Sequence, residues 1–85
     1  IKRPRRYKVL LLNDHYTTMD FVVQILVDIF RKSPKDAERI MMNVHRNGIG
    51  IAGVYARDLA EAKVLAAHKR AQDAGYPLRC DLEPE

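Results

Sequence analysis

The chain has 85 residues, 47% hydrophobic and 31% charged, which is typical of one globular domain and excludes a disordered chain or a second core. No apolar run approaches the roughly 20 residues that a membrane helix needs, so we expect no membrane partner. The net charge is +4, and five of the fifteen basic residues lie among the first eight. This distribution predicts a flexible basic lead-in (residues 1–6) before a single domain (residues 7–85). Because the basic excess is confined to the lead-in, we expect no basic folded face for nucleic acid.

Residues 7–12 carry apolar side chains on both faces of a strand pattern, which predicts a central strand covered on both sides at its far end. A polar segment, residues 13–20, leads into a helix whose N-cap is Thr18 and which is apolar around most of its circumference. Ser33 and Pro34 predict the start of a second helix, and Gly48 predicts its end.

Residues 48–55 form a glycine-rich strand pattern, which indicates a bulge or a close approach of the backbone. Residues 58–74 predict an alanine-rich helix that packs close to the sheet and ends at Gly75, and residues 78–83 alternate as a half-buried antiparallel strand. The order β-α-α-β-α-β predicts an α+β fold, a three-stranded antiparallel sheet with three helices on one face.

Catalytic and metal-binding patterns are missing from the sequence. The three histidines have no metal-ligand spacing and no second cysteine beside them, and no nucleophile is paired with a base. We therefore expect no enzyme active site, no metal and no cofactor. The single Cys80 predicts an inward-facing core thiol and favours a reducing, cytoplasmic setting.

Two features indicate a binding site. The polar segment 13–20 lies between two apolar elements, which suits a ligand with a charged group beside an apolar one, although Asn, Asp and Thr also favour turns and helix caps. His45 borders the apolar stripe of the second helix, where it could cap backbone carbonyls or accept a hydrogen bond from a cationic ligand.

Five motifs follow one another along the chain: Asn13-Asp14-x-Tyr16-Thr17-x-Met19-x-Phe21-Val22, Met41-x-x-Val44-His45-x-x-Gly48, Gly53-Val54-Tyr55, Ala60-Glu61-x-Lys63-Val64 and Pro77-Leu78-x-Cys80-x-Leu82-Glu83. In this order they resemble the ClpS family, the bacterial adaptors that deliver N-degron substrates to the ClpA unfoldase of the ClpAP protease. The similarity runs in register from residue 7 to residue 83.

The resemblance implies a non-enzymatic adaptor that binds the free α-amino group and the large first side chain (Leu, Phe, Tyr or Trp) of its substrates. The residues implied to bind the α-amine are Asn13, His45, His15 and Asp14. Those implied to line the side-chain pocket are Leu11, Leu12, Thr17, Met19, Val22, Met41, Val44 and Leu78. The unfoldase is expected to contact Asp58, Glu61 and Lys63.

Two positions depart from the family pattern. His15 stands where a second acid is common, and Thr18 where a proline is usual. An imidazole in place of the acid removes attraction for an ammonium group, so we expect weaker or more selective recognition, as in a second paralogue of the family. The alternative is an RNA- or ribosome-associated module that uses the basic lead-in, and binding of peptides by their first residue would distinguish the two.

Overall fold

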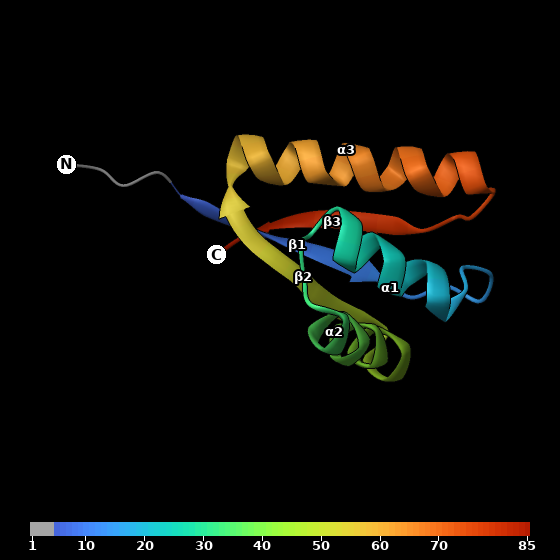
Figure 1. The fold of residues 1–85 in the computed structure, drawn as a ribbon. Helices are drawn as coiled ribbons and strands as arrows, with labels where there is room; N and C mark the ends of the chain where they lie inside the picture. Colours follow the sequence, from blue (N-terminus) through green and yellow to red (C-terminus); the bar gives the residue numbers. More distant parts are fainter. Residues whose placement is uncertain (1–4) are drawn as a thin grey trace.

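The computed structural model describes residues 5–85. Its elements are β1 (Arg6–Leu12), α1 (Met19–Asp28), α2 (Pro34–Asn47), β2 (Ile49–Ala56), α3 (Arg57–Ala74) and β3 (Arg79–Pro84). The strands form one antiparallel sheet in the order β2-β1-β3, and the predicted fold class is confirmed (Figure 1). Most of the predicted lead-in lies outside the described residues, and Arg6 belongs to β1, one residue before the predicted strand start.

The helix boundaries follow from capping residues that the sequence shows directly. Thr18 Oγ1 accepts the Phe21 N–H at 3.2 Å to start α1, and Ser33 Oγ accepts the Asp36 N–H at 3.1 Å to start α2. Gly48 and Gly75 end α2 and α3 in the left-handed conformation, with φ of 83° and 80°. These four predictions are confirmed.

The sheet has one covered face and one open face. Pairing with β3 places Val9 and Leu11 of β1 beside Leu82 and Cys80, on the face that the helices cover, and both β1 side chains are fully buried. β1 is central, as predicted, but the prediction of cover on both sides is wrong. On the other face Leu12 pairs with Ile49, which is 42% exposed, because all three helices pack against the first face.

Strand β2 contains both features that its glycines predicted, a bulge and a close approach of the backbone. Val9 pairs with Gly53 and Leu10 with Ile51, so Ala52 is an extra residue and forms a β-bulge. A Cβ atom on Gly50 would lie 2.7 Å from Val44 Cγ2, so the missing side chain allows α2 to approach the sheet closely.

The third helix closes one side of the domain. Its buried residues are small (Ala60, Ala67 and Ala71), which brings the helix close to the sheet as predicted. Arg70 reaches from α3 to Asp28 of α1, with 2.8 Å between Nη1 and Oδ2. Among residues 5–85 no helix combines the length and apolar character needed to cross a membrane.

Candidate functional site

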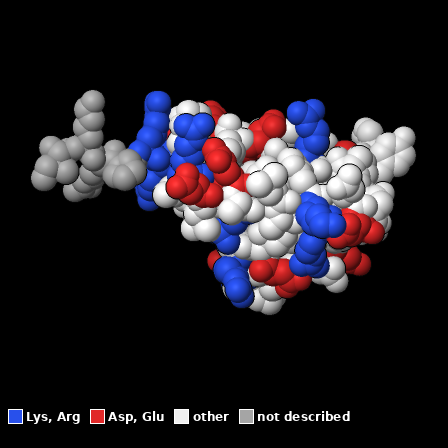
Figure 2. Space-filling model, turned by 90° about the horizontal axis from the view of Figure 1, so that it is seen from above, with Lys and Arg blue, Asp and Glu red and all other residues white. Residues whose placement is uncertain are grey.

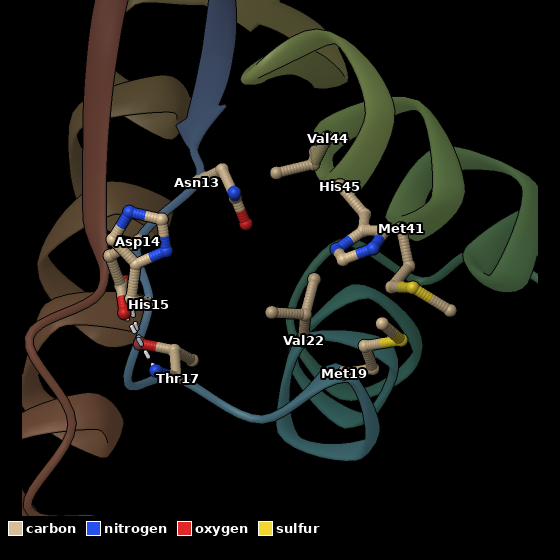
Figure 3. A pocket seen from close by; sticks show the side chains of 9 residues that line it. All are labelled: Asn13, Asp14, His15, Thr17, Met19, Val22, Met41, Val44 and His45. Carbon is tan, nitrogen blue, oxygen red and sulfur yellow. Dashed lines mark hydrogen bonds between the residues drawn. The ribbon is translucent and has the colours of Figure 1, made fainter.

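A hollow of about 210 Å³ opens between the loop after β1, the start of α1 and the second half of α2 (Figure 3). Its lining residues come from two separate segments of the sequence, residues 13–22 and residues 41–45. They are Asn13, Asp14, His15, Thr17, Met19, Val22, Met41, Val44 and His45. Every one of them is among the residues that the sequence indicated for ligand binding, so folding brings the two halves of the predicted site together.

Asn13 and His45 form the polar mouth of the hollow. The Asn13 N–H donates to the Gly48 carbonyl oxygen at 2.9 Å, which ties the end of β1 to the end of α2. Figure 3 shows the Asn13 amide and the His45 imidazole facing each other across the opening. Both residues are exposed, and within residues 5–85 neither side chain makes a hydrogen bond. Two groups able to accept hydrogen bonds are therefore available to a ligand from solvent.

Asp14 is bound to its own loop. Its Oδ1 accepts the N–H groups of Tyr16 at 2.8 Å and Thr17 at 2.6 Å, and its Oδ2 accepts the Thr17 hydroxyl at 2.7 Å (Figure 3). Partial burial favours the neutral carboxyl, but the hydrogen bonds from Thr17 and Tyr16 and the charge of His15 outweigh it. Together they hold the pKa of Asp14 below its ordinary value of 3.8, so the carboxylate is ionised at neutral pH.

His15 occupies the position where the family pattern has an acid. Its side chain is exposed and lies on the same side of the hollow as Asp14, with His45 on the other side (Figure 3). A positive charge there would repel a cationic ligand, whereas a neutral imidazole can accept a hydrogen bond.

The apolar wall comes from two facing helices. Met19 and Val22 lie one turn apart on α1, and Met41 and Val44 lie one turn apart on α2. Val22, Met41 and Val44 are nearly buried, whereas Met19 is 45% exposed at the rim. Met side chains adapt to irregular shapes, so this wall suits an apolar side chain inserted between the helices.

Three residues expected in the pocket lie elsewhere. Leu11 is fully buried among the core residues, and Leu78 is 5% exposed in the same core. Leu12 points to the opposite face of the sheet, because side chains alternate along β1. These three leucines are therefore not among the residues that line the hollow in this structure, whereas Thr17, Met19, Val22, Met41 and Val44 are.

The residues expected to face an unfoldase do not share one surface. Asp58 and Glu61 are exposed near the start of α3, where Glu61 accepts a hydrogen bond from Arg57 Nε at 2.9 Å. Lys63 turns inward instead: its Nζ donates to the Ile29 carbonyl oxygen at the end of α1 and lies 5.2 Å from the centroid of the Tyr55 ring. This contact gives Lys63 a role in packing α3 against α1.

Charge over the α3 side of the molecule is mixed. Figure 2 shows Lys and Arg interspersed with Asp and Glu on this face, around an uncharged centre. A nucleic-acid-binding domain usually gathers basic residues on one face, and this face has no such grouping. The RNA alternative depends on the basic lead-in instead, most of which lies outside the described residues. Residues 5–85 also contain no cluster of three His, Cys, Asp or Glu side chains that could hold a metal ion.

Comparison with known proteins gives the family. Residues 2–81 match the family described as "ATP-dependent Clp protease adaptor protein ClpS". Two bacterial relatives carry the description "ATP-dependent Clp protease adapter protein ClpS". The protein from Lawsonia intracellularis is 60% identical over 98% of this chain and 76% of its own length, and that from Maricaulis maris is 55% identical over 99% and 77%.

Among solved structures, Agrobacterium tumefaciens ClpS2 bound to L-phenylalaninamide superposes with a TM-score of 0.93 at 44% identity, covering 98% of this chain and all of that one. Sequence and fold thus agree over nearly the whole length. The resemblance inferred from the five motifs is confirmed: this chain belongs to the ClpS family, whose members are adaptors of the ATP-dependent Clp protease and not proteases themselves.

Proposed function

We propose that the hollow binds the first residue of N-degron substrates and that the protein hands these substrates to a ClpA-type AAA+ unfoldase for degradation by ClpAP. The observation that carries this proposal is the position of Asn13 and His45, two acceptors facing each other at the mouth of an apolar hollow. A terminal residue with a free amine and an apolar side chain has matching chemistry.

The amine would bind at the mouth. A protonated α-amino group presents three N–H donors, and each needs an acceptor once water is displaced. Asn13 Oδ1 and a neutral His45 ring nitrogen supply two acceptors, and the third donor stays accessible to water or to His15. The ionised Asp14 carboxylate adds electrostatic attraction. An acetylated N-terminus lacks both the charge and two of the donors, so it should bind poorly.

The first side chain would insert between Met19 and Val22 on one side and Met41 and Val44 on the other. Burying one large apolar side chain stabilises a complex by roughly 1.5–3 kcal/mol, or about 10- to 200-fold in affinity. A narrow entrance between the two helices would exclude side chains branched at Cβ, such as Val and Ile. The similarity to ClpS2, which was solved with L-phenylalaninamide, supports Phe as an accepted first residue, and the family resemblance extends the proposal to Leu, Tyr and Trp.

Delivery would use a second surface. Asp58 and Glu61 are exposed at the start of α3, at the opposite end of β1 from the hollow's loop (Figure 1), and remain our proposed contacts with the unfoldase. Lys63 would act through packing, because its ammonium group is turned toward α1. Partnership with ClpAP would place the protein in the bacterial cytoplasm.

Fluorescence anisotropy tests the binding step. Labelled peptides that begin with Phe or Leu should saturate the protein, whereas a Val-initiated peptide and an N-acetylated Phe peptide should bind at least about tenfold more weakly. Equal affinity for the free and the acetylated Phe peptide would contradict the proposal. For the delivery step, adding this protein to ClpAP should accelerate degradation of a Phe-initiated reporter, and the charge reversals Asp58→Lys and Glu61→Lys should reduce that acceleration without changing peptide affinity.

A further inference from the structure

We propose that Asp14 is a positioning residue, whose carboxylate holds the rim of the hollow in its binding shape, in place of the direct contact with the amine that the family resemblance implies. This inference rests on the proposed function, because it assigns a specific task within the same site. It concerns the Asp14–Thr17 clasp, which we define as Asp14, the N–H groups of Tyr16 and Thr17, and the Thr17 hydroxyl.

The clasp uses most of the acceptor capacity of the carboxylate. An ionised carboxyl has about four lone-pair sites, and three are occupied by donors at 2.6 to 2.8 Å. These are charge-assisted hydrogen bonds, which are the strong ones in proteins. A ligand amine that took Asp14 as a principal acceptor would have to compete with donors from the protein's own loop.

The position of the clasp in the chain explains what it controls. Asn13 directly precedes it, and Thr18, the N-cap of α1, directly follows it. Met19, the most exposed residue of the apolar wall, is the first residue of α1. The clasp therefore fixes both the polar mouth and the edge of the apolar wall, although Asp14 itself touches neither Asn13 nor Met19 through a hydrogen bond within residues 5–85.

Thr17 has a matching role on the other side of the clasp. It lines the hollow, yet its hydroxyl points back to Asp14 Oδ2 and leaves its methyl group as the surface it can offer a ligand (Figure 3). If Asp14 were chiefly an amine ligand, removing the Thr17 hydroxyl would release the carboxylate and strengthen binding. If the clasp positions the rim, the same change weakens binding.

Two substitutions of Asp14 separate geometry from charge. Asp14→Asn keeps the short side chain, an oxygen for the two backbone N–H groups and an amide that can bond the Thr17 hydroxyl, but loses the charge. Asp14→Glu keeps the charge but is one methylene too long for bonds to donors two and three residues ahead. We expect Asn to stay within about fivefold of the wild-type affinity for a Phe-initiated peptide, and Glu to lose about tenfold or more. The reverse order would overturn the inference.

Thr17→Val and Thr17→Ser complete the test with Asp14 intact. Valine keeps the shape and removes the donor, so affinity should fall several-fold, whereas serine keeps the donor and loses only the methyl group, so its affinity should fall less than that of Thr17→Val. The amide proton chemical shifts of Tyr16 and Thr17 report the clasp directly. They should keep their wild-type values in Asp14→Asn and change in Asp14→Glu. The remaining amide signals show whether each variant is folded. Unchanged affinity for Thr17→Val would contradict the positioning role. Failure of the wild-type protein to bind the peptide would instead refute the proposed function.

Discussion

Two histidines, on opposite sides of this small domain, are used in opposite ways. His68 on α3 accepts the Cys80 N–H at 3.0 Å through Nε2, which satisfies a backbone donor of β3. The side chain of His45 on α2, in contrast, makes no hydrogen bond within residues 5–85 and faces a hollow. Lys63 and Arg70 also bond to groups of α1 on the α3 side. On the α3 side, the side chains of His68, Lys63 and Arg70 therefore bond to other groups of the protein. On the α1–α2 side, the side chain of His45 has no such partner among the described residues. This difference supports the α1–α2 side as the proposed binding site.

The largest effect should come from the two acceptors at the mouth. Asn13→Ala or His45→Ala each removes a hydrogen bond to a charged amine, worth about 1.5–3 kcal/mol, so affinity for a Phe-initiated peptide should fall about 10- to 150-fold. His68→Ala is the matched control: it should leave affinity nearly unchanged and lower the free energy of unfolding by about 1 kcal/mol. Anisotropy and chemical denaturation measure the two quantities. If His68→Ala lost as much peptide affinity as His45→Ala, the two histidines would not differ in their contribution to binding.

A second variant tests how the hollow is shaped. Gly50→Ala would place a methyl group 2.7 Å from Val44 Cγ2, closer than side chains normally approach, so Val44 or the part of α2 that carries it must shift. Overpacking of this kind lowers the free energy of unfolding by about 1–3 kcal/mol, and the displaced Val44 should narrow the apolar wall. Peptides beginning with Trp should lose more affinity than those beginning with Leu. An equal loss for both would show that Gly50 serves only the fold.

The sequence predicted features that depend on neighbours in the chain. Thr18, Ser33, Gly48 and Gly75 cap or end helices through contacts within four residues, so their roles were evident from residue type and spacing. The nine residues of the hollow were also all indicated, because ordered motifs carry information that local patterns lack.

The remaining features depend on distant elements. Leu12 resembles a pocket residue in sequence, but its face of the sheet depends on pairing with β2 and on which face the helices cover. Lys63 resembles a surface lysine, and only the nearness of the end of α1 to α3 turns it inward. The β1 pattern predicted cover on both faces, because apolar residues on an open sheet face cannot be told from buried ones by periodicity.

The burial of Cys80 predicts that its thiol reacts slowly in the folded protein. Burial, with a smaller contribution from the charge of Asp81, raises the pKa of Cys80 to about 12, so the thiol stays protonated at neutral pH. Iodoacetamide at pH 8 should leave the folded protein unmodified for hours and label the urea-unfolded protein within minutes, as mass spectrometry would measure. Rapid labelling of the folded chain would mean that β3 opens readily on this side.

The smallest effect concerns Asp14, whose carboxylate accepts hydrogen bonds from its own loop. Because its pKa is lower in the folded protein than the ordinary 3.8, its ionised form stabilises the fold above that pH, and the contribution disappears as pH falls below 3.8 through the folded value. The difference in free energy of unfolding between wild type and Asp14→Asn, measured by denaturant titration, should therefore shrink between pH 6 and pH 3. A constant difference would mean that the clasp does not favour the charged carboxyl.

The most direct test of the account is a titration of the isotope-labelled protein with L-phenylalaninamide, followed by amide, imidazole and methyl NMR signals. We predict saturable shifts at Asn13 and His45 and at the methyl groups of Met19, Val22, Met41 and Val44, with those of His68 and the α3 alanines unchanged. Saturation with shifts confined to the basic lead-in or α3, or no saturation at all, would contradict the proposal that this hollow binds the first residue of another protein.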